Sequence, residues 1–287
     1  MPASVYVQIA VNGVVLACLY VLVALGLNLI FGIMHIVNFA QGTVFMLAGL
    51  GLFVLNVGFG LNYFAAGLLS VAGMAGLGLV MERFLFRRLF GQFLPSLVMS
   101  LGLLLAIEGA CWMRFGITSQ AVPAMLPGVV HVLGASVSQQ RVVVIAGGLV
   151  LIGALFLFIR FTRAGKAIRA VEQEPEGAVL QGIDIHDVTR LVFVVSFVLS
   201  GLAAVLAAPI LPIDPNMGEM PLLKGLVIIV LGGMGSVTGT LVGGLVIGFT
   251  ESAVGTFFDQ VDASLASFAF LMLILLFRPS GLMPYRM

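Results

Sequence analysis

The stretch "FGIMHIVNFAQG", residues Phe31 to Gly42, lies inside one of the most apolar regions of the chain. It carries His35, Asn38 and Gln41 within seven residues. A helix that only anchored a protein in lipid would have no use for these side chains, because polar groups at membrane depth are costly. The stretch therefore indicates a membrane segment that faces protein or a watery path.

Composition supports a membrane protein throughout. Of 287 residues, 61% are hydrophobic and only 9% are charged, whereas soluble domains carry about 25% charged residues. The net charge of +1 gives no indication of nucleic acid as a partner. Cys18 and Cys111 lie in apolar segments without metal-ligand spacing, so we expect small buried hydrophobes and no metal site. Residues 1–30 contain no Lys or Arg, so we expect this segment to be retained rather than cleaved as a signal peptide.

Long apolar runs predict an all-α, polytopic integral membrane protein in which residues 1–287 form a single transmembrane domain. A membrane helix needs roughly 20 apolar residues, and uninterrupted runs favour helices over barrel strands. The candidate segments are 5–31, 36–57, 61–81, 93–113, 141–159, 191–211, 222–258 and 262–277. The seventh is too long for one span and is interrupted by "GGMGS", which predicts a half-helix plus a full helix or two short crossings. We therefore expect eight or nine passes.

Basic residues predict the orientation, because Lys and Arg accumulate in cytoplasmic loops. The cytoplasmic candidates are the loop with Arg83, Arg87 and Arg88, the loop 160–190, and the C-terminus with Arg278 and Arg286. The segment "LPIDPNMGEMP" (211–221) is acidic and fits the outside, where alternation also places the loop 114–140.

Two segments are interrupted by glycines, and we expect both to be broken or re-entrant. The glycines are Gly32 and Gly42 in the first segment and Gly232, Gly233 and Gly235 in the second. Paired broken segments are typical of transport sites, since unwound backbone at membrane depth is tolerated only inside protein or along a cavity. Gly235, Gly239 and Gly243 also recur every fourth residue, which favours close helix packing.

The polar residues of the first segment have two interpretations. In one continuous helix over 28–42, Asn28, His35 and Asn38 would share a face, with Gln41 farther round. They could form interhelical hydrogen bonds, or they could line a translocation path, which the second broken segment favours. We therefore predict Asn28, His35, Asn38 and Gln41 as path residues.

Three charges lie within apolar segments. We expect Lys224 to extend to the outer surface, with attraction of an anionic solute group as the alternative. We expect Glu251 to be interfacial. Glu108 lies off both broken segments and has no evident role, and a charge at the bilayer centre costs about 2.5–3.5 kcal/mol on insertion scales.

The loop 160–190 is the only long polar stretch. Its pattern predicts a short amphipathic helix, "AGKAIRAVEQE", then Pro175, a second short helix and Gly182. Such a loop is either a solvated connection or a docking surface for another protein.

Four stretches together resemble a known family: "GLNLIFGIMHIVNFAQG", "AGKAIRAVEQEPEGAVLQGI", "VLGGMGSVTGTLVGGLVIGFTES" and "RPSGLMP". They are similar to the shorter of the two permease types of branched-chain amino-acid ABC importers, in the same order over nearly the whole chain. Family members often show "NFAHG" where this chain has "NFAQG", so Gln41 replaces a His and the difference bears on specificity.

The resemblance implies a permease subunit of the bacterial inner membrane that binds no cofactor and hydrolyses no ATP. The chain agrees, since it lacks the G-x-x-x-x-G-K-[ST] motif. The implied partners are a second permease chain, two cytoplasmic ATP-binding subunits, a soluble solute-binding protein outside, and membrane lipid. The loop 163–183 would supply the coupling helix that contacts the ATPase. The residues matching its pattern are Gly165, Arg169, Ala170, Glu176, Ala178 and Gly182.

Other functions stay open at this point. Related permeases serve importers for urea, amides and aromatic or other organic acids. A carrier driven by an ion gradient would need a midplane carboxylate, for which Glu108 is the candidate. A channel would need a selectivity ring, and an intramembrane enzyme would need a partner for His35; the sequence indicates neither.

Overall fold

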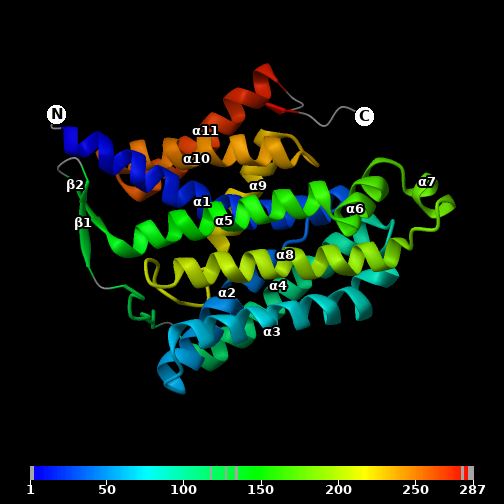
Figure 1. The fold of residues 1–287 in the computed structure, drawn as a ribbon, viewed down its shortest axis with the longest axis horizontal. Coiled ribbons are helices and arrows are strands. Elements are labelled where there is room, and N and C mark those ends of the chain that lie inside the picture. Colours follow the sequence, from blue (N-terminus) through cyan, green and yellow to red (C-terminus); the bar gives the residue numbers. More distant parts are fainter. Residues whose placement is uncertain (1–2, 117, 127, 133–134, 279–280, 284–287) are drawn as a thin grey trace.

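Figure 1 shows the computed structural model as a bundle of helices that run roughly along one long axis. The structure describes residues 3–116, 118–126, 128–132, 135–278 and 281–283. The α-helices are α1 (Ala3–Met34), α2 (Ala40–Phe53), α3 (Tyr63–Phe84), α4 (Phe93–Phe115), α5 (Gln139–Phe161), α6 (Arg163–Gln173), α7 (Pro175–Leu180), α8 (Ile185–Ala207), α9 (Glu219–Gly232), α10 (Val237–Phe257) and α11 (Gln260–Phe277). A π-helical turn, Val54–Gly58, extends α2, and a 3₁₀ turn, Phe86–Leu89, precedes α4.

Seven helices in the described part of the chain are long and apolar enough to cross a membrane: α1, α2 with its π-helical extension, α3, α4, α5, α8 and α10. The shorter α11 is also apolar, and α9 has only 14 residues. The predicted segment 222–258 is therefore a half-helix, α9, followed by a full helix, α10. With the shorter α11, the described part of the chain has seven or eight helices suited to crossing a membrane, at the lower end of the eight or nine passes expected.

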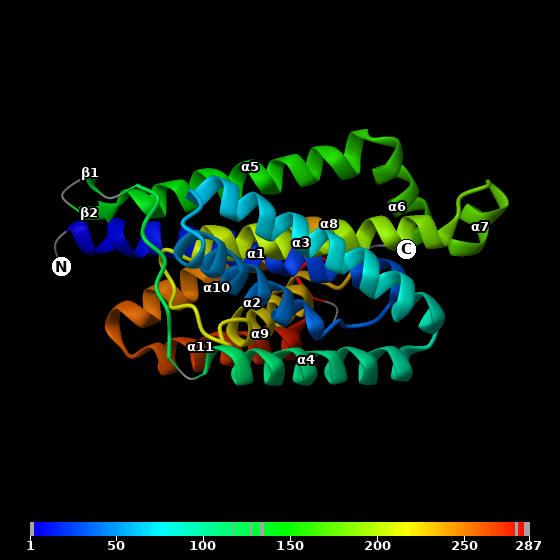
Figure 2. The ribbon, with the colours of Figure 1, turned by 90° about the horizontal axis from the view of Figure 1, so that it is seen from below.

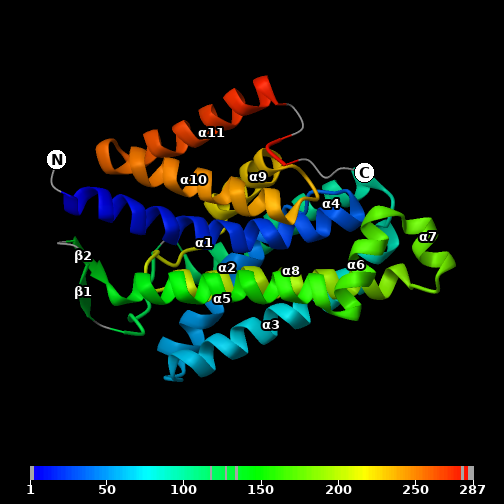
Figure 3. The ribbon, with the colours of Figure 1, turned by 45° about the horizontal axis from the view of Figure 1, so that its top comes forward.

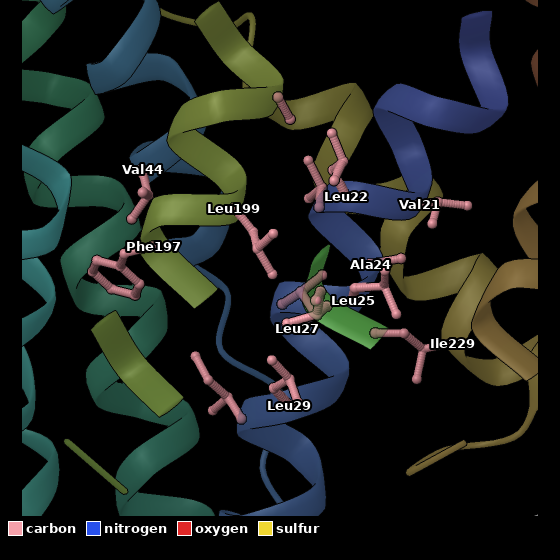
Figure 4. Packing of buried hydrophobic residues seen from close by; sticks show 14 of the residues in the cluster. Val21, Leu22, Ala24, Leu25, Leu27, Leu29, Val44, Phe197, Leu199 and Ile229 are labelled. Atoms are coloured by element: carbon pink, nitrogen blue, oxygen red, sulfur yellow. The ribbon is translucent and has the colours of Figure 1, made fainter. Parts of the chain in front are cut away.

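Helix α1 forms the centre of the bundle. It is apolar on all sides, and such a helix is stable only when it is surrounded by other segments. Leu22, Val23, Ala24 and Ile30 are fully buried, and Figure 4 shows the α1 side chains packed among residues of α8 and α9. Figure 2 shows α5 and α4 on opposite sides of the molecule with α1 between them. Most of α4 is exposed.

Residues 28–42 do not form one continuous helix, because α1 ends at Met34 and α2 begins at Ala40. At the break, His35 has a φ of +54°, a conformation that non-glycine residues rarely adopt. The second break lies between α9 and α10, where Gly233 and Gly235 have φ values of +104° and +86°. Glycine adopts such values without steric cost. Both expected breaks are present, but Gly32 and Gly42 themselves lie within α1 and α2, on either side of the first break.

The segment after α11 returns to the second break. The N–H groups of Leu282 and Met283 donate to the carbonyls of Leu231 and Gly232 at 2.8 and 3.0 Å. The last carbonyls of a helix have no partner within it, so these bonds complete the C-terminal end of α9. This gives the "GLM" part of the "RPSGLMP" motif a structural role.

The loops that the predicted orientation assigns to opposite sides lie at opposite ends of the bundle (Figure 1). Figure 1 places α6, α7 and the turn between α3 and α4 at one end, and the start of α1 and the hairpin of β1 (Val129–Val132) and β2 (Ala135–Ser138) at the other. The hairpin, in which Val130 pairs with Val137, was not expected from the sequence. Arg286, one of the basic residues used for the orientation, lies outside the described residues.

Candidate functional site

A cleft of about 270 Å³ opens between the start of α2, the middle of α4 and the start of α9. Its walls come from segments that are far apart in the sequence. The lining residues are Phe39, Gly42, Thr43, Met46, Leu104, Glu108, Pro215, Asn216, Gly218, Glu219, Leu222 and Leu223. We call this the outer cleft, because the loop before α9 belongs to the predicted outer side.

A small apolar pocket of about 20 Å³ lies farther along α9 and is lined by Leu27, Phe31, Val37, Leu226, Ile229, Val230 and Met234. Leu222 and Leu223 line the outer cleft, and Leu226, Ile229 and Val230 line this pocket. These five positions recur every three or four residues, so they share one side of the helix. We call them the α9 face. It connects the outer cleft to the second break and is entirely aliphatic.

Gln41 and Asn38, two of the predicted path residues, are turned into the protein. Both are completely buried. The Gln41 side-chain amide donates to the Ser196 carbonyl at 3.0 Å and to the Ser200 hydroxyl, both on α8. Asn38 Oδ1 accepts from the Ala40 N–H at 3.2 Å, in the first turn of α2. Neither residue lines the outer cleft or the pocket along α9, which favours the hydrogen-bonding interpretation.

Asn28 joins the two broken segments to each other. Its Oδ1 accepts the Gly235 N–H at 2.8 Å, and its side chain is 2% exposed. His35 lies apart from the other three predicted path residues: it is exposed, with its ring 6.1 Å from that of Phe31. The break at residues 35–39 contributes to the cavities through Val37 and Phe39, not through its polar residues.

Two pairs of glycines bring backbones into direct contact at the breaks. A Cβ on Gly218, before α9, would lie 2.0 Å from the Gly42 carbonyl oxygen. A Cβ on Gly232 would lie 2.3 Å from the Gly239 backbone. Gly243 is similarly close to α9, with the Ile228 carbonyl oxygen 2.9 Å from its Cβ position. The predicted close packing is confirmed for Gly239 and Gly243, whereas Gly235 lies in the turn instead.

The ionisable residues of α9 and α10 form a buried pair. Lys224 Nζ lies 3.2 Å from Glu251 Oε2, with side chains 0% and 4% exposed. The Tyr20 hydroxyl on α1 donates to Glu251 Oε1 at 3.2 Å, and Phe268 of α11 places its ring 5.3 Å from Lys224 Nζ. The expectation of an extended Lys224 is therefore wrong, and Glu251 is buried in the protein as its partner. Neither charge is isolated, because the ion pair lowers the cost of burying both.

Glu108 lines the outer cleft together with Gly42 and Glu219. The expectation that it lies away from the broken segments is wrong, because the fold brings the middle of α4 against the start of both. Among the described residues no group of three or more His, Cys, Asp or Glu side chains is arranged to hold a metal ion. Cys18 and Cys111 are buried free thiols, as predicted.

The predicted amphipathic helix and its successor are present as α6 and α7. Thr162 caps α6 by accepting the Gly165 N–H at 2.9 Å, and Pro175 occupies the start of α7, where its missing N–H has no cost. Gly182 ends the pair with a φ of +82°. The loop pattern alone was sufficient to predict this local structure.

The six predicted coupling residues divide into two groups. Gly165 and Ala178 are buried, and Arg169 and Ala170 are half-buried against the bundle, whereas Glu176 and Gly182 face solvent. A Cβ on Gly165 would lie 2.4 Å from the Ile159 carbonyl oxygen, so this glycine permits α6 to fold back on α5. Val179 and Leu180 were not among the predicted residues, but they are 51% and 86% exposed at the tip of α7.

Glu172 connects α6 to the last turn of α1 and to the second break. Its Oε1 lies 2.6 Å from the position of a Cβ on Gly32 and 3.4 Å from one on Gly235. Burial raises the pKa of this carboxyl to about 7, because desolvation disfavours its charged form. Glu172 was not among the residues predicted from the sequence, since nothing in the local pattern indicated that this acidic residue of a polar helix turns inward.

Comparisons with known proteins agree with the fold and identify the family. The family described as "Branched-chain amino acid transport system / permease component" matches residues 9–277. The permease protein BraD of a high-affinity branched-chain amino acid transport system from Pseudomonas aeruginosa is 30% identical over 97% of this chain and 95% of its own length. The corresponding permease protein LivH of Escherichia coli is 29% identical over the same shares.

A solved structure gives an independent comparison of the fold. PsaBC from Streptococcus pneumoniae, in complex with Fab, superposes with a TM-score of 0.51 at 14% identity, covering 92% of this chain and 90% of that one. At this identity the likeness concerns the fold alone. From the family match and the full-length relatives, the chain belongs to the permease components of branched-chain amino acid ABC import systems, multi-pass membrane subunits whose ATPase is a separate chain.

Proposed function

We propose that the amino acid crosses the membrane along the α9 face, from the outer cleft to the second break. The observation that carries this proposal is the single aliphatic side of α9 that lines both cavities. An aliphatic wall accommodates a branched side chain, and Thr43, Glu108 and Asn216 at the outer cleft offer replaceable polar contacts to the solute's charged groups. Such modest contacts suit a path, because a solute must be able to leave it as well as enter.

A second permease chain, either a longer sister chain or another copy, completes the other side of this path. Leu101, Leu105 and Met113 on α4 are exposed beside the outer cleft, so this face is open either to a partner or to lipid. Outside, a solute-binding protein docks on the loops 114–140 and 212–221. In the bacterial inner membrane this orientation places the C-terminus in the cytoplasm.

The helices α6 and α7 couple this path to two ATP-binding subunits. Leu180 and Val179 provide an exposed apolar tip, and exposed apolar groups of this kind mark contact sites for partners. At its other side α6 contacts the last turn of α1 and the second break through Glu172. If the ATPase displaces α7, the short helix α6 therefore transmits the movement to both broken segments.

A cysteine at Leu226 tests the path. In the assembled transporter, the thiol of Leu226→Cys should react with a water-soluble maleimide, because the reactive thiolate forms only where water is present. The attached maleimide should then block the path and abolish most ATP-driven uptake. The measurement is labelled-leucine uptake before and after the reagent. Cys18 and Cys111 are buried, so the background reaction is low.

Leu157→Cys is the matched control for the path experiment, since Leu157 is 55% exposed on the outer surface of α5. In lipid its thiol should stay unreacted and uptake should continue. Equal reactivity at both positions, or unchanged uptake after complete modification of Leu226→Cys, would exclude the α9 face as the path.

Replacement of Gly182 tests the coupling surface. A valine at its φ of +82° costs about 1–2 kcal/mol, so the turn after α7 should shift and displace Leu180. We expect Gly182→Val to insert into the membrane normally while uptake and ATPase stimulation by the loaded binding protein both fall severalfold. Gly182→Asn is the control, because Asn tolerates this conformation; equal losses in both variants would contradict the proposed reason.

A further inference from the structure

A cavity of about 410 Å³ lies on the other side of α1 from the pocket along α9. It opens where α6 meets α1, the end of α5 and the turn between α9 and α10. Figure 3 shows α6 close to the ends of α1 and α5 at the cytoplasmic end of the bundle. We call it the inner cavity. It does not share a lining residue with the outer cleft.

Opposite charges line the inner cavity without neutralising each other. Arg169 and Glu172 stand one turn apart on α6 and both face it, and Arg160 contributes a second guanidinium from α5. Arg169 Nε is buried and has no hydrogen-bond partner among the described residues. Glu172 likewise forms no ion pair or side-chain hydrogen bond within the described part of the chain. Burial without a partner raises its pKa, and a cation beside it would relieve this cost.

The remaining walls are suited to an aliphatic group and to a few polar contacts. Leu29 of α1, Ile159 of α5 and Ile168 of α6 line one part of the cavity, and Ser236 and Thr238 beyond the second break line another. A ligand that fits these walls carries an anionic group, an ammonium group close to it, and an aliphatic side chain.

We propose that the inner cavity binds an aliphatic α-amino acid from the cytoplasm, with its carboxylate on Arg169 and its ammonium group on Glu172. This inference rests on the proposed function, which supplies the orientation and makes the transported solute itself the ligand. Because the cavity is walled by α6 on one side and by α1 and the α9–α10 turn on the other, a bound amino acid ties the coupling helix to α1 and to the second break. A ligand that binds one arrangement more tightly shifts the population toward it, so accumulated solute slows further import.

The test is uptake into proteoliposomes that contain the complete transporter, with ATP in the lumen and the loaded binding protein outside. The lumen contains either no leucine or unlabelled leucine, in addition to ATP. The initial rate of labelled-leucine uptake is measured in both cases. For each variant, the rate with luminal leucine is divided by the rate without it. Luminal leucine should slow the wild-type protein. Glu172→Gln should require about tenfold more luminal leucine for equal inhibition, since it loses one charge-assisted contact.

Glu174→Gln is the matched control, because Glu174 ends the same helix but is exposed; it should be inhibited as the wild type is. Direct binding of labelled leucine to the purified complex without the binding protein should show the same order of affinities. Inhibition that is absent, or equal in wild type and Glu172→Gln, would overturn the inference. A second result would also overturn it. If leucine has no effect and native mass spectrometry finds a zwitterionic phospholipid bound to the wild type but not to Glu172→Gln, the cavity binds lipid instead.

The failure of this inference differs from failure of the proposed function. If the path along α9 is wrong, the Leu226→Cys experiment fails whatever the lumen contains. If only the inner cavity is misassigned, uptake into a leucine-free lumen is retained, and maleimide still inhibits uptake by the Leu226→Cys variant. Luminal leucine then has no effect that depends on Glu172.

Discussion

Lys224→Met should destabilise the folded protein more than any of the other substitutions. The change leaves Glu251 buried at 4% exposure without its partner, 3.2 Å away in the wild type. Removal of one member of a buried ion pair costs about 3–5 kcal/mol, because an uncompensated charge remains. The measurement is the thermal unfolding of the purified protein, together with ATP-driven uptake. We expect a lower melting temperature and little or no uptake.

The double variant Lys224→Met/Glu251→Gln distinguishes loss of the pair from loss of a single charge. Replacement of both partners removes the unpaired carboxylate, and buried ion pairs often exchange for neutral groups at little cost. Its stability should return most of the way toward the wild type. Lys166→Met, on the exposed side of α6, is the single-site control and should change little. A Lys224→Met protein as stable as this control would mean that the pair is hydrated rather than buried.

Gly239→Ala should have the second largest effect, although it adds only one methyl group. The new Cβ would lie 2.1 Å from the Gly232 carbonyl oxygen. Because this oxygen belongs to the backbone and cannot rotate away, α9 and α10 must separate. Overpacking of this kind costs about 1–3 kcal/mol and occasionally more. Because α9 carries the proposed path, uptake should fall further than stability does.

Gly76→Ala is the matched control for this crossing. Gly76 lies within α3, and a Cβ there would meet nothing within 4 Å. Alanine in place of an unconstrained helical glycine stabilises by about 0.5–1 kcal/mol, so this variant should be as stable as the wild type or more so. Thermal unfolding and uptake are measured on both variants in parallel. A tolerated Gly239→Ala would contradict the direct backbone contact between α9 and α10.

Membership in the family resolves the alternatives that the sequence left open. A gradient-driven carrier, a channel and an intramembrane enzyme are set aside by the match over residues 9–277. Glu108, the carboxylate that a carrier would have needed, lies at the outer cleft, where a side chain could contact the solute's ammonium group without carrying ions across the membrane.

Local features of the chain were predictable because their causes are local. Apolar runs determine which segments lie in the membrane, Pro175 and Gly182 mark the limits of α7 and its turn, and Gly233 and Gly235 mark the second break. Even the amphipathic α6 follows from its own periodicity. Each of these results depends on residues within about two helical turns of each other, which a single sequence contains in full.

The direction in which a polar side chain points was decided only by tertiary structure. Gln41 finds its partners on α8 and Asn28 finds its partner at Gly235. These two side chains therefore hold segments of the bundle together, and Asn28 also lines the inner cavity. The proposed path is lined by aliphatic residues such as Leu226, which resemble those of any membrane core. Lys224 and Glu251, 27 positions apart in the numbering, neutralise each other across two helices. The sequence by itself determined the membrane class, the breaks and the two short helices α6 and α7, because propensity and hydropathy act locally. The partners of buried polar groups depended on which distant helices pack together, which no local pattern contains.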